Sequence, residues 1–356
     1  MPDALIERTR MRYFNQAHQK GFTLLELVLV LFLIGLLASA GLLFTEGQQD
    51  EAYFNETQRR QTIIRDAIIR STERVVNGQP ELAGFVVDNG RLPYCLAELV
   101  VSPFDLTQSA SAPGFYISPC DDSLELLKPT VTASGIRTGW YGPYIQTNPE
   151  QDGFRRFRDG YQNGNNPNDP NFGWVVTLAE SGTVYSAPIT APIDPPAEIF
   201  YLYSEGYDLS TTTDDYPPLG DDDLVVADDW LAPATFNIRF VNTSAVSAIS
   251  NLDASLDWTI TLAKSSTDPN AYSSDFSFTP PGSSIPAQGT YEYTVAVSSS
   301  TAFSDKLPAG YYIISARCDD SLAIAPASCP AMTSSPYTVM VLPRQQLGPI
   351  RWNIEP

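Results

Sequence analysis

The sequence has little basic charge, a single histidine and only four cysteines. It carries 21 lysine and arginine residues against 41 aspartate and glutamate residues, a formal net charge of −20 over 356 residues. Because nucleic acids and anionic lipid headgroups attract basic surfaces, this balance argues against nucleic-acid binding and against docking on anionic headgroups. The length predicts two or three domains, and 43% hydrophobic residues are enough to form their cores.

One long apolar segment lies near the N-terminus. Residues 22–44 read FTLLELVLVLFLIGLLASAGLLF, with Glu26 as the only charged residue. About 20 apolar residues cross a bilayer core of roughly 30 Å, so the segment predicts one transmembrane helix. Residues 1–21 hold four basic and two acidic side chains. The positive-inside rule therefore predicts a cytoplasmic N-terminus and export of everything after residue 44.

The junction ahead of the apolar segment carries a distinctive motif. Residues 20–37, KGFTLLELVLVLFLIGLL, resemble the class III signal of type IV pilins and type II secretion pseudopilins. The resemblance implies a leader, residues 1–21, that a prepilin peptidase removes between Gly21 and Phe22, followed by N-methylation of the Phe22 amine. It also implies that the Glu26 carboxylate pairs with the Phe22 ammonium of a neighbouring subunit during filament assembly. Thr23-x-x-Glu26 is in addition a capping box, and the two roles are compatible.

The histidine count excludes several chemistries once the leader is removed. His18 lies in the implied leader, so the processed chain would contain no histidine. Its absence excludes Ser-His-Asp and Cys-His catalysis, histidine-ligated zinc and histidine pH switching. Catalysis would then depend on a carboxylate pair, and no recognisable cleft motif accompanies the acidic residues. We therefore expect a protein that is not an enzyme.

Helical periodicity continues beyond the apolar segment. Apolar or small residues recur at helical spacing between charged ones, and Asn77-Gly78-Gln79-Pro80 indicates a stop. The sequence therefore predicts a long helix over residues 22–77, transmembrane over 22–44, with its second half packed on a globular head. The face expected to pack comprises Phe54, Ile64, Ala67, Ile68, Ser71 and Val75.

Residues 78–230 are expected to form that head, with a small antiparallel sheet. Short apolar runs broken by Gly, Pro, Asn and Asp are typical of strands and loops. Residues 88–93, DNGRLP, and 139–144, GWYGPY, are similar to two short strings of the major pseudopilin of type II secretion. The resemblance implies a pseudopilin-like head.

Residues 204–230 contain nine acidic residues and no lysine or arginine. The string Tyr203-Ser204-Glu205-Gly206-Tyr207-Asp208 resembles the pseudopilin strand end that precedes a Ca²⁺-binding loop. The resemblance implies a Ca²⁺ cofactor, and oxygen ligands suit this cation. The alternative is a solvated acidic loop without a metal. The resemblance implies Asp208 and Asp223 as ligands, with Ser204 as a further oxygen donor. Asp221 and Asp222 are supporting candidates that match no family position.

Residues 231–356 are rich in Ser, Thr, Ala and Pro and poor in charge. Six candidate strands separated by turn signals predict an all-β, immunoglobulin-like or transthyretin-like sandwich. A module for adhesion or partner contact and a spacer within a filament both fit this pattern. The candidate strands are residues 235–242, 256–264, 275–278, 290–298, 310–317 and 336–342.

The four cysteines predict two disulfides in an exported chain. Pairing Cys95 with Cys120 and Cys318 with Cys329 keeps each bridge within one predicted domain. No Cys-x-x-Cys pair occurs, which argues against zinc.

The fold class predicted is α+β: a long N-terminal helix, a small antiparallel-sheet pilin head and an all-β sandwich. The expected function is a non-enzymatic pilin-like filament subunit for type II secretion or a type IV pilus, two systems that the sequence does not distinguish. Its expected partners are a prepilin peptidase, other pilin or pseudopilin subunits and the bacterial inner membrane. It would cross that membrane once, with the head exported into a periplasmic or cell-surface filament. The alternative is a membrane-anchored adhesin that binds through the C-terminal sandwich without polymerising.

Overall fold

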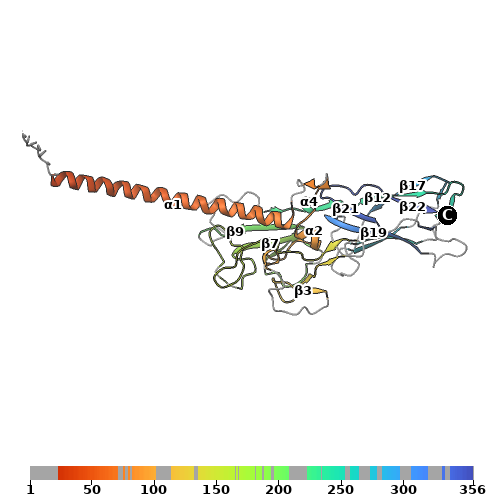
Figure 1. Ribbon diagram of the computed structural model, residues 1–356, viewed down its shortest axis with the longest axis horizontal. Helices are drawn as coiled ribbons and strands as arrows, with labels where there is room; N and C mark the ends of the chain where they lie inside the picture. Colours follow the sequence, from red (N-terminus) through yellow and green to blue (C-terminus); the bar gives the residue numbers. More distant parts are fainter. Residues whose placement is uncertain are drawn as a thin grey trace, which may run out of the picture. The chain divides into compact units, whose positions relative to one another are not determined.

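The computed structural model (Figure 1) is a mixed α+β structure with one long N-terminal helix and many antiparallel strands. It divides into two units, residues 1–52 and residues 53–356. The residues described are 23–70, 75–76, 79–80, 82–101, 114–131, 135–164, 166, 168–180, 182–186, 188–193, 196–207, 223–233, 235–252, 257–263, 273–278, 283–296, 306–319, 331–332 and 337–355.

The long helix α1 runs over Leu24–Ile68. The prediction that it continues to residue 77 was wrong. The amide of Arg70 bonds to the Ala83 carbonyl at 3.1 Å, so the chain has left the helix by that point. Val75–Val76 (β1) then pairs antiparallel with Gln79–Pro80 (β2). Two β-branched valines ahead of Asn-Gly are a hairpin signal, and here it outweighs the helical periodicity.

Within the second unit, four residues of the predicted packing face are buried or half-buried, whereas Ser71 lies outside the described residues and Val75 lies in β1 and not in the helix. Ile64, Ala67 and Ile68 are buried, Thr57 is buried with them, and Phe54 is half-buried. The Gln61 side chain donates to the Leu202 carbonyl of the adjacent sheet at 3.2 Å. Within the described residues, no helix combines the length and the apolar character needed to cross a membrane. The span predicted over residues 22–44 stays a prediction.

The head contains the small antiparallel sheet that the sequence predicts. Its strand order is β10-β9-β7-β8, and every pair is antiparallel. Buried residues alternate along β7, as expected for a sheet with one face on the core. The head elements are α2 (Phe85–Asn89), α3 (Ala97–Val100), β3 (Phe115–Ile117), β4 (Glu125–Leu127), β5 (Thr130–Val131), β6 (Arg137–Thr138), β7 (Trp174–Glu180), β8 (Thr183–Ser186), β9 (Ile199–Ser204) and β10 (Asp223–Val225).

After the one-turn helix α4 (Ala227–Trp230), every described helix or strand of the C-terminal region is a strand. Two four-stranded sheets, β17-β12-β22-β20 and β15-β14-β19-β21, meet where the rings of Tyr337 and Trp352 lie 5.3 Å apart. All six candidate strands coincide with observed ones, whereas the immunoglobulin-like assignment stays a prediction. The strands are β11 (Leu231–Pro233), β12 (Thr235–Asn242), β13 (Ile249–Leu252), β14 (Asp257–Ala263), β15 (Ser273–Phe278), β16 (Ser283–Ile285), β17 (Thr290–Ala296), β18 (Lys306–Pro308), β19 (Gly310–Asp319), β20 (Ala331–Met332), β21 (Tyr337–Val341) and β22 (Ile350–Glu355).

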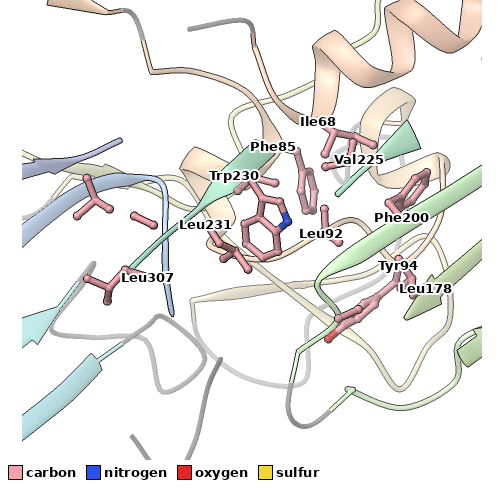
Figure 2. Packing of buried hydrophobic residues seen from close by; sticks show 14 of the residues in the cluster. Ile68, Phe85, Leu92, Tyr94, Leu178, Phe200, Val225, Trp230, Leu231 and Leu307 are labelled. Atoms are coloured by element: carbon pink, nitrogen blue, oxygen red, sulfur yellow. The ribbon is translucent and has the colours of Figure 1, made fainter. Parts of the chain in front are cut away.

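The hydrophobic core continues from the head into the C-terminal strands. Trp230 is fully buried, and it lies between Phe85 on the head side and Leu231 on the other (Figure 2). β11 pairs antiparallel with β18, and the Lys306 ammonium bonds to the Glu198 carboxylate at 2.6 Å. Residues 53–356 therefore pack as one unit. The domain boundary predicted at residues 230/231 stays a prediction.

Candidate functional site

The first half of α1 exposes apolar side chains on consecutive positions, and therefore on every side of the helix. A helix that is apolar all round is normally covered by lipid or by other helices. This segment of the chain consequently has a large surface that is suited to burial against something else. Its exposed large residues are Leu24, Leu25, Leu27, Val28, Leu29, Val30, Leu31, Phe32, Leu33, Ile34, Leu36 and Leu37.

Glu26 is the one carboxylate in this apolar surface. The hydroxyl of Thr23 accepts the Glu26 amide at 3.2 Å, and the Thr23 carbonyl accepts the Leu27 amide at 3.1 Å. Thr23 therefore caps the helix, as half of the predicted capping box. The Glu26 side chain is exposed and makes no ion pair within the described residues. Gly21 and Phe22, the predicted processing residues, lie outside those residues.

Residues 88–93 and 139–144 of the head lie against each other. The Tyr144 hydroxyl donates to Asp88 Oδ2 at 2.8 Å, and the Gly139 amide donates to the Asp88 carbonyl at 2.9 Å. Burial of the Tyr144 ring, together with the neighbouring Asp88 charge, raises the pKa of that hydroxyl well above its ordinary value. Its proton therefore stays in place to bond Asp88 across the physiological pH range.

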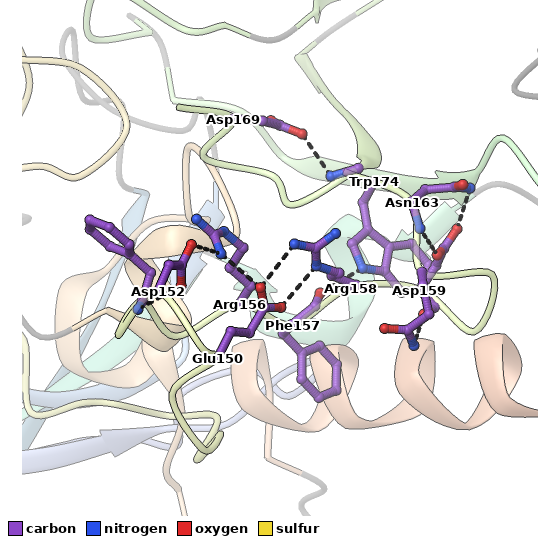
Figure 3. Close-up of polar contacts among 12 residues, drawn as sticks. Glu150, Asp152, Arg156, Phe157, Arg158, Asp159, Asn163, Asp169 and Trp174 are labelled. Atoms are coloured by element: carbon purple, nitrogen blue, oxygen red, sulfur yellow. Dashed lines mark hydrogen bonds and ion pairs between the residues drawn. The ribbon is translucent and has the colours of Figure 1, made fainter. Parts of the chain in front are cut away.

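A buried carboxylate, Asp159, contacts Ser204, the residue at which the predicted acidic loop begins. Its Oδ1 accepts the Asn163 amide at 2.8 Å, and its Oδ2 accepts the Asn163 side-chain amide at 2.7 Å (Figure 3). The Ser204 hydroxyl, at the end of β9, also donates to Asp159 Oδ2. The Asn163 side chain further bonds the Gly206 carbonyl at 2.9 Å. Asp159 and Asn163 thus fix the place where the chain enters the loop.

Close packing against α1 positions Asp159. The Gly160 amide donates to the Thr57 hydroxyl at 3.0 Å, and the Arg60 guanidinium donates to the Arg158 carbonyl at 2.7 Å. A β-carbon on Gly160 would collide with the Tyr53 carbonyl. Gly160 is therefore required for the close approach to α1, and the Asp159-Gly160 pair is the sequence signal from which this site could have been predicted.

The structure describes only part of the predicted Ca²⁺ site. Asp208, Asp221 and Asp222 lie outside the described residues, and Asp223 is described only through its backbone in β10, opposite Tyr201. In the part of the chain that the structure covers, no group of three or more acidic, histidine or cysteine residues could hold a metal ion. The Ser204 hydroxyl bonds the Asp159 carboxylate, and the Asn163 side chain bonds both that carboxylate and the Gly206 carbonyl. Three oxygen groups therefore lie close together here. These are hard oxygen donors of the kind that Ca²⁺ takes.

One of the two predicted disulfides is present. Cys95, next to α3, is bonded to Cys120, after β3. Cys318 lies in β19, while Cys329 lies outside the described residues. The pairing of Cys318 with Cys329 therefore stays a prediction.

Comparison with known proteins identifies the N-terminal segment alone. The family described as the prokaryotic N-terminal methylation motif matches residues 16–42. No curated protein and no solved structure matches the chain. The match supports a prepilin leader of the type IV pilin kind, and it covers both the predicted cleavage position and Glu26.

Proposed function

We propose that this chain is a non-enzymatic filament subunit, either a pseudopilin or a minor pilin. The N-terminal methylation motif at residues 16–42 carries the proposal, because it suggests processing by a prepilin peptidase and assembly with pilin subunits. The helix that follows, apolar on all sides with one carboxylate at Glu26, supports it. Such helices would leave the membrane and pack together as the filament core.

The chain is proposed to be anchored in the bacterial inner membrane by residues 22–44, with its N-terminus in the cytoplasm. The disulfide between Cys95 and Cys120 supports export of the head, because disulfides persist in oxidising compartments. The head and the C-terminal sheets would then lie on the filament surface, in the periplasm or outside the cell.

The assembly role of Glu26 is tested by Glu26→Ala. The substitution would leave the Phe22 ammonium of the neighbouring subunit without its carboxylate. Because an unpaired ammonium in an apolar bundle costs about 3 kcal/mol, we expect incorporation into filaments to fall roughly a hundredfold. The measurement is the amount of the chain in the sheared filament fraction of a host that assembles it. Removal of the leader, followed as a loss of mass, should be unaffected.

Glu51→Ala is the matched control, because Glu51 is an exposed carboxylate on the same helix beyond the apolar segment. It should assemble as the unaltered chain does. Equal incorporation of the Glu26 and Glu51 variants would contradict the proposed role of Glu26. Absence of the unaltered chain from the filament fraction would favour the adhesin alternative.

We further propose that the loop between Ser204 and Asp223 binds one Ca²⁺, with Ser204 and the implied aspartates as ligands. Millimolar Ca²⁺ should raise the melting temperature of residues 53–356, and a chelator should lower it. At a hundred times Kd the expected stabilisation is about 2.7 kcal/mol. Ser204→Ala should shrink this shift, whereas Ser186→Ala, an exposed serine at the end of β8, should leave it intact. A melting temperature that does not respond to Ca²⁺ would contradict the site and favour the alternative, a solvated acidic loop without a metal.

A further inference from the structure

A tight turn at residues 150–154 presents an aromatic side chain to solvent. The Glu150 amide donates to the Phe154 carbonyl at 2.8 Å, and the Gly153 amide donates to the Glu150 carbonyl at 2.9 Å. Gly153 has a φ of 86°, which L-residues with side chains rarely adopt. The Phe154 side chain at the end of this turn is 63% exposed.

Four charged side chains hold the turn in place (Figure 3). Glu150 accepts two bonds from Arg158, both at 2.9 Å, and one from Arg156 at 2.7 Å. Asp152 accepts a second bond from Arg156 at 2.7 Å. The Arg156 side chain is only 5% exposed. Since Arg158 is itself bonded to α1 through Arg60, the turn is attached to the rigid part of the head.

This network keeps its charge over the physiological pH range. The bond from Arg158 lowers the pKa of Glu150, and the bond from Arg156 lowers the pKa of Asp152. A carboxylate whose pKa is depressed by folding stabilises the fold above its unfolded pKa, and that contribution is lost as the pH falls through the folded value. The turn is therefore fully formed at neutral pH.

The turn exposes the side chains of Phe154 and Arg155 to solvent. The Arg156 guanidinium lies 5.4 Å from the centroid of the Phe154 ring and supports its inner side. Arg155 is exposed and makes no ion pair among the described residues. A single exposed apolar residue needs no explanation on its own. Here, however, the turn fixes the backbone of Phe154 and the ring contacts Arg156, which lowers the entropy lost on binding. Aromatic and arginine side chains are also typical interface anchors.

The charge of the turn is opposite to that of the chain. Residues 150–158 hold two acidic residues and three arginines, a net charge of +1, whereas the whole chain carries −20. A second copy of the chain, with 41 acidic residues against 21 basic ones, therefore carries a net charge opposite to that of this turn. Opposite charge favours encounter and fixes the orientation of the two surfaces.

We propose that Phe154 and Arg155 form a subunit contact, in which this turn docks on the acidic surface of a second copy of the chain. The contact rests on the proposed filament function, because assembly is what brings copies together. Phe154 supplies the apolar anchor, and Arg155 pairs with a carboxylate of the neighbour.

The test replaces Phe154 by the photoreactive p-benzoylphenylalanine in the full chain, within cells that assemble it. Ultraviolet light should produce an adduct of twice the mass of the chain. The matched control carries the same probe at Val184, an apolar residue in β8 that is 61% exposed, and should give little adduct. Adding Arg155→Glu should reduce the Phe154 adduct roughly tenfold, while Arg155→Lys should retain it.

An adduct no stronger at position 154 than at 184, an adduct with a different protein, or one that ignores Arg155→Glu would overturn the contact. The Glu26→Ala experiment separates this result from the filament proposal. If filaments form and depend on Glu26 but no adduct forms at position 154, the contact alone fails. If the adduct forms while Glu26→Ala assembles normally, the contact stands and the filament mechanism fails.

Discussion

Glu98→Ala is expected to lower the free energy of unfolding of residues 53–356 by about 3–5 kcal/mol, the usual result of breaking one side of a buried ion pair. Glu98 is fully buried and accepts both guanidinium nitrogens of Arg91, at 2.8 and 2.9 Å. It also accepts the Tyr94 amide at 3.0 Å and the Ser118 hydroxyl at 2.8 Å. The substitution leaves a mostly buried cation and two neutral donors without their acceptor. Urea unfolding followed by circular dichroism measures the loss.

Glu292→Ala is the matched control for this prediction. Glu292 pairs with Arg239 at 2.9 Å, but both side chains are more than 40% exposed. Because solvent screens such a pair, its removal should cost only about 0.2–1 kcal/mol. A similar small loss for Glu98→Ala would mean that Arg91 finds other partners, such as the Tyr94 ring 4.0 Å away.

Local pattern was sufficient to predict β12, whose two faces differ in polarity. Phe236, Ile238 and Phe240 alternate with exposed or half-buried residues along β12, and its predicted bounds match the observed Thr235–Asn242. The same alternation runs through Ile350, Trp352 and Ile354 of β22, but β22 is not among the predicted strands. β22 pairs in parallel with β12 across more than a hundred residues of sequence, and no local turn signal marks that pairing.

Buried polar groups were not predictable in the same way. Asp159 is stabilised by Ser204, 45 residues further along the chain, and Glu98 by Ser118, 20 residues along. Sequence indicates that such residues are charged and therefore normally exposed. Only the fold reveals the donors that compensate their burial. The acidic loop was predicted from its charge and from the string at residues 203–208, whereas Asp159, the carboxylate that fixes its entry point, lies in another segment of the chain.

The Asn77-Gly78 motif that follows α1 in the sequence is compatible with two local structures. Asn77-Gly78 terminates helices and also connects two-residue hairpins. The preceding residues decide between these outcomes, and Val75 and Val76 favour a strand. The periodicity of Ile64, Ala67 and Ile68 is real, but it ends with the helix at Ile68.

Trp230→Ala is expected to destabilise residues 53–356 by about 3–5 kcal/mol and to loosen both the head and the C-terminal strands. Trp230 is 0% exposed, and its indole donates to the Glu198 carbonyl at 3.0 Å. Its own carbonyl accepts the Ala309 amide at 2.7 Å, next to β18. The side chain therefore fills the core where the two regions join. Amide hydrogen exchange should become faster in β9 of the head and, to a similar degree, in the paired strands β11 and β18.

Trp352→Ala distinguishes this effect from general loss of core packing. Trp352 is equally buried, but it lies in β22 and contacts Tyr337 within the C-terminal sheets. Its removal should speed exchange in β12, β21 and β22 while β7 and β9 keep their protection, since opening there is local. If Trp230→Ala also left the head protected, the two regions would be separate folding units that merely touch. Faster exchange on both sides of residue 230 would instead mean that the C-terminal sheets are a structural extension of the head.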